Sequence, residues 1–162
     1  MEKYQEIIET IERMKHSQVI SKHLLFTDAI TGEKLSEHAK YVALEPDEKP
    51  LVLVDVKKAF CGRMTGLLVT DRNVYYRCLR IKTFFRALTM FYSSKITGKV
   101  ALCDVNQISL GDWIMGSGTD TSYLGHRLSI NGAEVGTLLL GKYYSFDDKL
   151  VENLKQLFKA LE

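Results

Sequence analysis

The sequence predicts an α+β fold in which helices come first, a run of antiparallel strands follows, and a helix closes the chain. Three observations predict this order. Apolar residues recur at helical spacing in residues 2–15, the periodicity becomes that of β-strands at Leu51, and the helical period returns in residues 145–162. Because helices and strands do not alternate, the pattern indicates an antiparallel rather than a parallel sheet.

The N-terminal part is expected to be helical. The apolar stripe of its first helix, residues 2–15, consists of Tyr4, Ile7, Ile8, Ile11 and Met14. Residues 18–28 fit either a helix or a short strand. A second helix is expected over residues 33–44, and the residues that it would bury are Leu35, Ala39, Val42 and Ala43. The proline-containing acidic stretch 45–50 is interpreted as a linker.

Residues 66–79 form the centre of the predicted sheet. Two apolar runs rich in Leu, Val and Tyr flank the polar break at residues 70–73, which is typical of a β-hairpin. Asp71 and Asn73 are residue types that tolerate such a turn. The apolar residues that would then share one buried face are Leu67, Val69, Val74 and Tyr76. Strands are accordingly expected over residues 51–56, 63–70 and 73–79.

Later segments predict more strands. We expect strands over residues 98–104 and 107–110, and we interpret residues 111–125, with four glycines, as a mobile loop anchored by Trp113 and Ile114. In residues 128–135 the Asn131-Gly132 pair supplies both positive φ angles of a type I′ hairpin turn. The expected register pairs Ile130 with Ala133, Ser129 with Glu134 and Leu128 with Val135.

The closing helix is expected to begin at a Ser145 cap. Asp147 and Asp148 suit its positive N-terminal end, and Lys155 and Lys159 suit its C-terminal end. Its apolar stripe consists of Phe146, Leu150, Leu154, Leu157, Phe158 and Leu161. A sheet with one exposed apolar end needs a lid of this kind.

The central hairpin also carries a family resemblance. Gly66, three apolar residues, Thr70-Asp71, a basic residue and an apolar-Tyr-Tyr run resemble the second and third strands of bacterial pleckstrin-homology-like (PH-like) domains. Upstream, residues 51–55 followed by Phe60 and Gly62 resemble the strand and turn that open those domains. The resemblance implies a PH-like split β-barrel of antiparallel strands with a C-terminal closing helix, preceded by N-terminal helices. It divides the chain into an N-terminal helical extension, residues 1–45, and a PH-like domain, residues 46–162.

Composition excludes some functions. The chain has 162 residues, 46% hydrophobic and 26% charged, with a net charge of +2, so it has no global drive towards nucleic acid, and none is expected as a partner. The segment after Met1 is charged and is followed by no long apolar run, which predicts neither a secretory signal nor a transmembrane helix. We therefore expect a cytoplasmic protein, with peripheral attachment to the inner face of the membrane as the alternative.

No catalytic or metal constellation is visible in the sequence. Cys61, Cys78 and Cys103 form no C-x-x-C pair and are interpreted as reduced thiols. His16 and His23 lie seven apart without a third ligand at metal-binding spacing. We expect no enzyme, no cofactor and no metal.

The strongest local signal is basic. Between Arg72 and Lys99 there are seven basic residues and no acidic residue. Apolar residues at helical spacing within residues 81–92 would form a basic amphipathic helix with an aromatic face. The candidate residues for binding a lipid or a partner are Arg80, Lys82, Phe84, Phe85, Arg86, Phe91 and Lys95. The competing interpretation packs this apolar face on the barrel or on a second copy and leaves the arginines solvated.

The expected function is that of a non-enzymatic bacterial binding or interaction module. The resemblance implies self-association for some such domains and phosphoinositide or peptide binding for their eukaryotic counterparts. The expected partners are a second copy in a homo-oligomer, another protein, or an anionic membrane surface. Peripheral membrane binding through residues 80–95 is the alternative, and a small enzyme with a cleft beneath the glycine-rich loop is a remote one.

Overall fold

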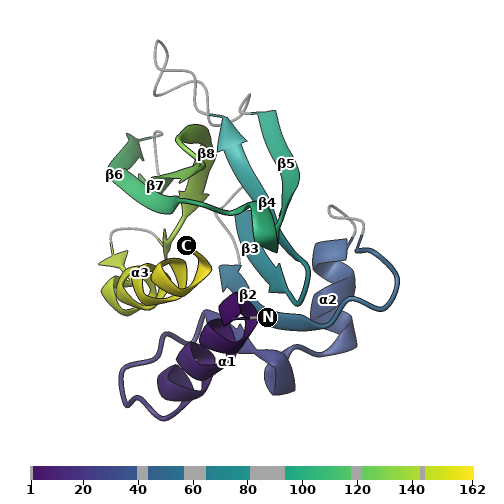
Figure 1. Cartoon of the computed structure of the whole chain (residues 1–162). Helices are drawn as coiled ribbons and strands as arrows, with labels where there is room; N and C mark the ends of the chain where they lie inside the picture. Colours follow the sequence, from purple (N-terminus) through teal and green to yellow (C-terminus); the bar gives the residue numbers. More distant parts are fainter. Residues whose placement is uncertain (1, 40–43, 57–64, 81–93, 118–121, 143–144) are drawn as a thin grey trace.

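The computed structural model describes residues 2–39, 44–56, 65–80, 94–117, 122–142 and 145–162. Figure 1 shows a strongly curved sheet with helices packed around it. The helices are α1 (Glu2–Lys15), α2 (Gly32–Ala39) and α3 (Asp148–Leu161), with the short 3-10 turns η1 (Thr27–Ala29) and η2 (Leu102–Asp104). The strands are β1 (Leu24–Phe26), β2 (Pro50–Val56), β3 (Thr65–Thr70), β4 (Asn73–Arg80), β5 (Ser94–Ala101), β6 (Ile108–Ser117), β7 (Ser122–Ile130), β8 (Ala133–Leu139), β9 (Gly141–Lys142) and β10 (Ser145–Phe146).

The main sheet is antiparallel and forms a half-barrel. Its strand order is β1-β2-β3-β4-β8-β7-β6, with β5 paired to β4 outside that path. β8 pairs with β4 at the single position where Leu79 lies opposite Thr137. The Leu139 amide also donates to the hydroxyl of Thr65, the first residue of β3, at 3.0 Å. β8 therefore lies next to the start of β3 along the same side of β4. This junction joins the two halves of the sheet, and the predicted α+β fold with an antiparallel sheet is confirmed.

The core lies between the concave face of the sheet and two helices. α1 and α3 contact each other and lie side by side in Figure 1. α1 contributes Ile7, Ile11 and Met14 to the main apolar cluster, which confirms the predicted helix and its buried stripe, except that Tyr4 is 40% exposed. α3 contributes the predicted residues Leu150, Leu154, Leu157, Phe158 and Leu161.

The central hairpin has the predicted register. Val69 lies opposite Val74 and Leu67 opposite Tyr76, so these four residues share the core face. The other face is also covered, because Leu53, Leu68 and Tyr75 form a second apolar cluster. The partly buried residues packed on that cluster come from the N-terminal segment: Leu25, Ile30, Leu35 and Leu44. The ambiguous residues 18–28 thus supply β1, which pairs with β2.

Asn131 and Gly132 form the predicted turn, with φ angles of 52° and 78°. Ile130 pairs with Ala133 and Ser129 with Glu134 as expected, but Leu128 lies opposite Gly136 instead of Val135. A bulge causes the shift. At Gly136 φ is 138°, and an added Cβ would lie 2.6 Å from the Cβ of Cys78. A glycine is required there because β8 approaches β4 so closely.

Several predicted boundaries were wrong. The glycine-rich residues 111–125 do not form a loop across their described part: residues 111–117 belong to β6 and 122–125 to β7, and the two strands pair from Trp113 to Ser117 after a register shift at residues 111–112. The predicted strand 98–104 begins earlier, at Ser94, and ends at Ala101 before η2. α3 is capped by Asp147, whose carboxylate accepts from the Leu150 amide at 3.1 Å, while Ser145 lies in β10. The second helix ends at Ala39 within the described residues, and positions 40–43 lie outside them.

Candidate functional site

The acidic stretch at residues 45–48 is a tight turn rather than a loose linker. Pro46 and Asp47 occupy its central positions, Asp47 has a φ of 67°, and the Glu48 amide donates to the Glu45 carbonyl at 3.4 Å. Proline followed by a residue with positive φ is the pattern of a type II turn. The Glu45 amide donates to the Glu48 carboxylate at 3.1 Å, so the turn also orients its own acidic side chain.

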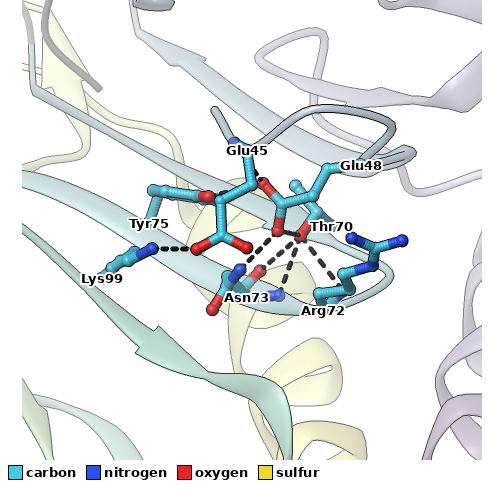
Figure 2. A network of polar contacts seen from close by, with 7 residues as sticks. All are labelled: Glu45, Glu48, Thr70, Arg72, Asn73, Tyr75 and Lys99. Carbon is cyan, nitrogen blue, oxygen red and sulfur yellow. Dashed lines mark hydrogen bonds and ion pairs between the residues drawn. The ribbon is translucent and has the colours of Figure 1, made fainter. Parts of the chain in front are cut away.

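Glu48 binds the β3–β4 hairpin through three side chains. Its carboxylate accepts from the Thr70 hydroxyl at 3.0 Å, the Asn73 side-chain amide at 2.5 Å and the Tyr75 hydroxyl at 2.5 Å. Figure 2 shows the turn lying directly over these side chains, with Lys99 reaching Glu45 from the neighbouring strand. The acidic clasp, as we name it, comprises Glu45, Glu48, Thr70, Asn73, Tyr75 and Lys99.

The Thr70 hydroxyl also closes the hairpin. Its Oγ1 accepts from the backbone N–H of Asn73 at 2.8 Å and from the backbone N–H of Arg72 at 3.2 Å. On the β2 side, the Lys49 amide donates to the Asp71 carboxylate at 3.0 Å. The predicted reversal at residues 70–73 is therefore confirmed, and side chains from both sides hold it.

Protonation states in the clasp follow from these contacts. Partial burial acts to raise the pKa of Glu48, but the hydrogen bonds from Tyr75, Asn73 and Thr70 outweigh burial and hold this pKa below its ordinary value. Burial, together with donation to Glu48, raises the pKa of Tyr75 to about 12. At neutral pH an ionised carboxylate therefore accepts from a neutral phenol. The carboxylate accepts hydrogen bonds from Thr70, Asn73, Tyr75 and the Glu45 backbone, and the clasp thereby holds the turn on the hairpin.

Lys99 connects the clasp to the edge of the sheet. It lies on β5 opposite Tyr75, and its ammonium group forms an ion pair with the Glu45 carboxylate. The side chains of Lys99 and Glu45 are 47% and 45% exposed, so water reaches the pair. A pair of this exposure is weak and readily exchanged for another partner.

β5 leaves one edge open among the described strands. It pairs with β4 alone, and in Figure 1 it lies beside β4 on the side away from β6, β7 and β8. The Leu102 amide donates to the Arg72 carbonyl at 2.7 Å, which sets the phase of the β4–β5 hydrogen bonds. Because hydrogen-bonded pairs alternate in an antiparallel ladder, Gly98 and Val100 direct their backbone groups at β4, and Thr97 and Lys99 direct theirs outwards.

The predicted basic site is only partly described. Arg80 ends β4 and is exposed, and Lys95 lies on β5 opposite Leu79. The other five candidates, Lys82, Phe84, Phe85, Arg86 and Phe91, fall in residues 81–93, outside the described residues, as does the expected amphipathic helix. The basic run is not all surface, because Arg77 is only 3% exposed. Arg77 lies opposite Gly66 of β3, and Gly66 lies opposite Asp55 of β2, which is also buried.

Of the cysteines and histidines noted in the sequence, Cys78 is buried and His23 contacts the backbone of β2. Burial raises the pKa of the Cys78 thiol to about 12, consistent with a buried inert cysteine, whereas Cys103 is exposed and Cys61 lies outside the described residues. The His23 ring lies 3.0 Å from the Asp55 carbonyl oxygen. Within the described ranges, no three His, Cys, Asp or Glu residues are grouped so as to hold a metal ion.

Sequence reasoning missed the clasp and the open edge. Glu45 and Glu48 looked like linker residues, and Thr97 had no signal of its own. One usable signal was present, since the acidic stretch 45–48 is the charge complement of the basic run from Arg72 to Lys99.

Comparisons with known proteins add no family. The sequence matches no protein-family model, no curated protein and no solved structure. Over the described residues, none of the helices combines the length and apolarity needed to cross a bilayer.

Proposed function

We propose that this chain is a non-enzymatic protein-interaction module with a PH-like fold, and that it binds an extended segment of its partner by adding that segment to β5. The observation that carries the proposal is the outward-facing backbone of Thr97 and Lys99. An edge strand with free N–H and C=O groups is a template for a further strand, and peptide-recognition domains use such edges.

The length and form of β5 support this role. The strand has eight residues, Ser94–Ala101, contains no proline and pairs with β4 without a register shift. Proteins commonly shorten, bend or cover an edge that must not pair. Among the described elements, β5 is neither shortened, bent nor covered in this way. Its lysines are the one feature of the strand that would oppose pairing with another strand.

The PH-like part of the proposal is supported by the half-barrel of antiparallel strands and the closing helix α3. Fold analogy does not transfer a ligand. The interaction role therefore depends on the edge and not on the resemblance.

Two substitutions at one position test the proposal. Thr97→Pro removes an outward N–H and leaves the inward hydrogen bonds of Gly98 and Val100 in place, and proline is tolerated at such edge positions. Thr97→Ala is the matched control, because it removes the side chain and keeps the N–H. The full chain is panned against a random-peptide display library, and selected peptides are measured by calorimetry against the parent and both variants.

We expect selected peptides to bind the parent and Thr97→Ala equally and to bind Thr97→Pro at least about tenfold more weakly, equivalent to 1.4 kcal/mol. Amide chemical-shift changes on peptide addition to the parent should centre on β5, a readout that does not need the proline variant to fold. Peptides that bind Thr97→Pro as well as the parent, or shifts confined to other strands, would show that β5 is not the binding edge.

Self-association remains a prediction. The amphipathic first helix offers no apolar face for it, because the structure buries Ile7, Ile11 and Met14 of that helix within one molecule. The apolar face expected in residues 81–92, which could pack on a second copy, lies outside the described residues.

A further inference from the structure

The charges beside the open edge identify the kind of segment that it accepts. Resting on the proposed function, we infer that the partner segment is acidic, with a carboxylate that pairs with Lys99, and that Glu45 occupies Lys99 until such a segment binds. Lys95, Thr97 and Lys99 occupy alternate positions of β5, at the residues whose backbone groups face outwards. An added strand would place its side chains at the same spacing.

The structure already contains one example of the expected contact. The Glu45 carboxylate, on the turn that lies over the β3–β4 hairpin, pairs with Lys99, so the ammonium group at this position of β5 already binds a carboxylate from another segment of the chain. The run from Arg72 to Lys99 contains no acidic residue that would repel an incoming one. Cross-strand pairs of opposite charge stabilise strand addition, whereas like charges directly opposite each other oppose it.

The same rule disfavours a second copy at this edge. Two β5 strands could pair in two long, symmetric antiparallel registers. In the first, Lys95 lies directly opposite Lys99 of the other copy. In the second, Thr97 lies opposite Lys99 of the other copy, so each Lys99 is diagonal to both lysines of that copy. Each arrangement collects four lysines at one junction, so the lysines repel self-pairing and leave the edge available to an acidic strand.

Edge lysines also serve simply to prevent aggregation. The two roles differ in a measurable way. A purely protective lysine repels every strand, whereas a recognition lysine gives an acidic strand an advantage over a neutral strand of the same shape.

Glu45 supplies the sharper test, because it is an internal competitor. Replacing it with Gln removes its hold on Lys99 and should strengthen acidic binding, while an unrelated loss of negative charge should have little effect. Glu134 is a suitable comparison, since it is an exposed carboxylate on β8 that pairs with Arg127 of β7 at 3.4 Å and not with a lysine of β5.

The probe is a fluorescein-labelled peptide of alternating glutamate and threonine, and its control carries glutamine in place of glutamate. Fluorescence anisotropy of both peptides is measured with the parent, Thr97→Pro, Lys99→Gln, Glu45→Gln and Glu134→Gln, at low and physiological salt. Phosphatidylserine vesicles are tested by cosedimentation with the parent and Thr97→Pro.

We expect the glutamate peptide to bind the parent more tightly than the glutamine peptide, with the difference shrinking in salt and in Lys99→Gln. Glu45→Gln should tighten glutamate-peptide binding about two- to fivefold, as expected for release of one exposed ion pair, and Glu134→Gln should leave it within about 1.5-fold. Thr97→Pro should weaken both peptides.

The outcomes separate the two proposals. Equal binding of the two peptides, still sensitive to Thr97→Pro, would overturn the acidic preference and retain the edge. Loss of the Thr97→Pro effect would overturn both. Vesicle binding that is equal in the parent and Thr97→Pro, without preference between the peptides, would identify an anionic membrane surface instead of an acidic strand.

Discussion

Removing the carboxylate of Glu48 should lower stability more than removing any other single polar group of the acidic clasp. Glu48→Gln replaces a charged acceptor of three side-chain hydrogen bonds by an amide whose nitrogen cannot accept. A hydrogen bond to a charged group contributes about 1.5 to 3 kcal/mol, and the amide oxygen retains part of this. We expect a loss of about 2 to 3 kcal/mol.

A double-mutant cycle isolates the contact with Tyr75. Tyr75 is only 2% exposed, so its hydroxyl has little access to water once Glu48 no longer accepts its hydrogen bond. Tyr75→Phe removes that donor and should cost about 1 to 2 kcal/mol. The double variant should lose less unfolding free energy than the two single variants lose in sum, by about 1 to 2 kcal/mol, because both substitutions remove the same hydrogen bond. Urea unfolding followed by circular dichroism supplies the four free energies.

Acid sensitivity gives a second readout of the same contact. The pKa of Glu48 is lower in the folded chain than the ordinary value of 4.5, so the unfolded chain binds more protons in this range. The contribution of Glu48 is therefore complete above the ordinary pKa and lost as pH falls through the folded pKa. Glu48→Gln should flatten this part of the profile. At the alkaline end, the raised pKa of Tyr75 predicts a loss of stability from pH 10 towards about 12.

Glu45→Gln is the control, because it breaks only an exposed pair and should cost less than about 1 kcal/mol. A coupling energy below about 0.3 kcal/mol between Glu48 and Tyr75, or an unchanged acid profile in Glu48→Gln, would refute the clasp as a stabilising contact.

Three further predictions concern the core, the strand junction and assembly. Leu154→Ala should lower the unfolding free energy by about 2 to 5 kcal/mol, measured by urea unfolding, while Lys155→Ala on the exposed side of α3 should change it by less than about 0.5 kcal/mol. Gly136→Ala should lower stability by at least about 1 kcal/mol, since φ is 138° there and the new methyl group meets Cys78. Light scattering should report a homo-oligomer, and a monomer mass at every concentration would exclude one.

Local patterns predicted much of the fold. Asn131-Gly132 specifies its turn by conformation alone, and the alternation around residues 70–73 specifies which residues face the core. The stripe of α3 follows from helical spacing and the need to cover the sheet. Each of these signals acts over a few residues, so one sequence is enough to recognise it.

The missed features depend on contacts between distant segments. In residues 111–125 the glycines looked like loop residues, but Gly125 lies in β7, where an added Cβ would come within 2.7 Å of the Thr137 side chain. A glycine that permits close approach of a neighbouring strand has the same appearance in sequence as one that gives mobility. The shift to a Leu128–Gly136 pair likewise arises where β8 meets β4.

The candidate site was missed for the same reason. Glu48 and Tyr75 are 27 positions apart, and nothing near Glu48 in the sequence specifies the hairpin as its partner. The cluster of basic residues was visible in the sequence, but its members differ in exposure. Arg77 is buried within the fold, whereas Lys99 faces solvent. Which cations are available to a partner therefore emerges only once the strands are paired.

The clasp and the open edge share one short turn, which leads to a last prediction. Glu45 and Glu48 lie three residues apart, and Glu48 anchors the turn to Tyr75. Loosening that anchor should also withdraw Glu45 from Lys99. Glu48→Gln and Tyr75→Phe should therefore bind the alternating glutamate peptide more tightly than the parent does, although both are less stable, whereas Leu154→Ala should be less stable without this gain. Anisotropy at a temperature where all variants are folded separates the cases. Equal peptide affinity in Glu48→Gln and the parent would mean that Glu45 holds Lys99 independently of its anchor.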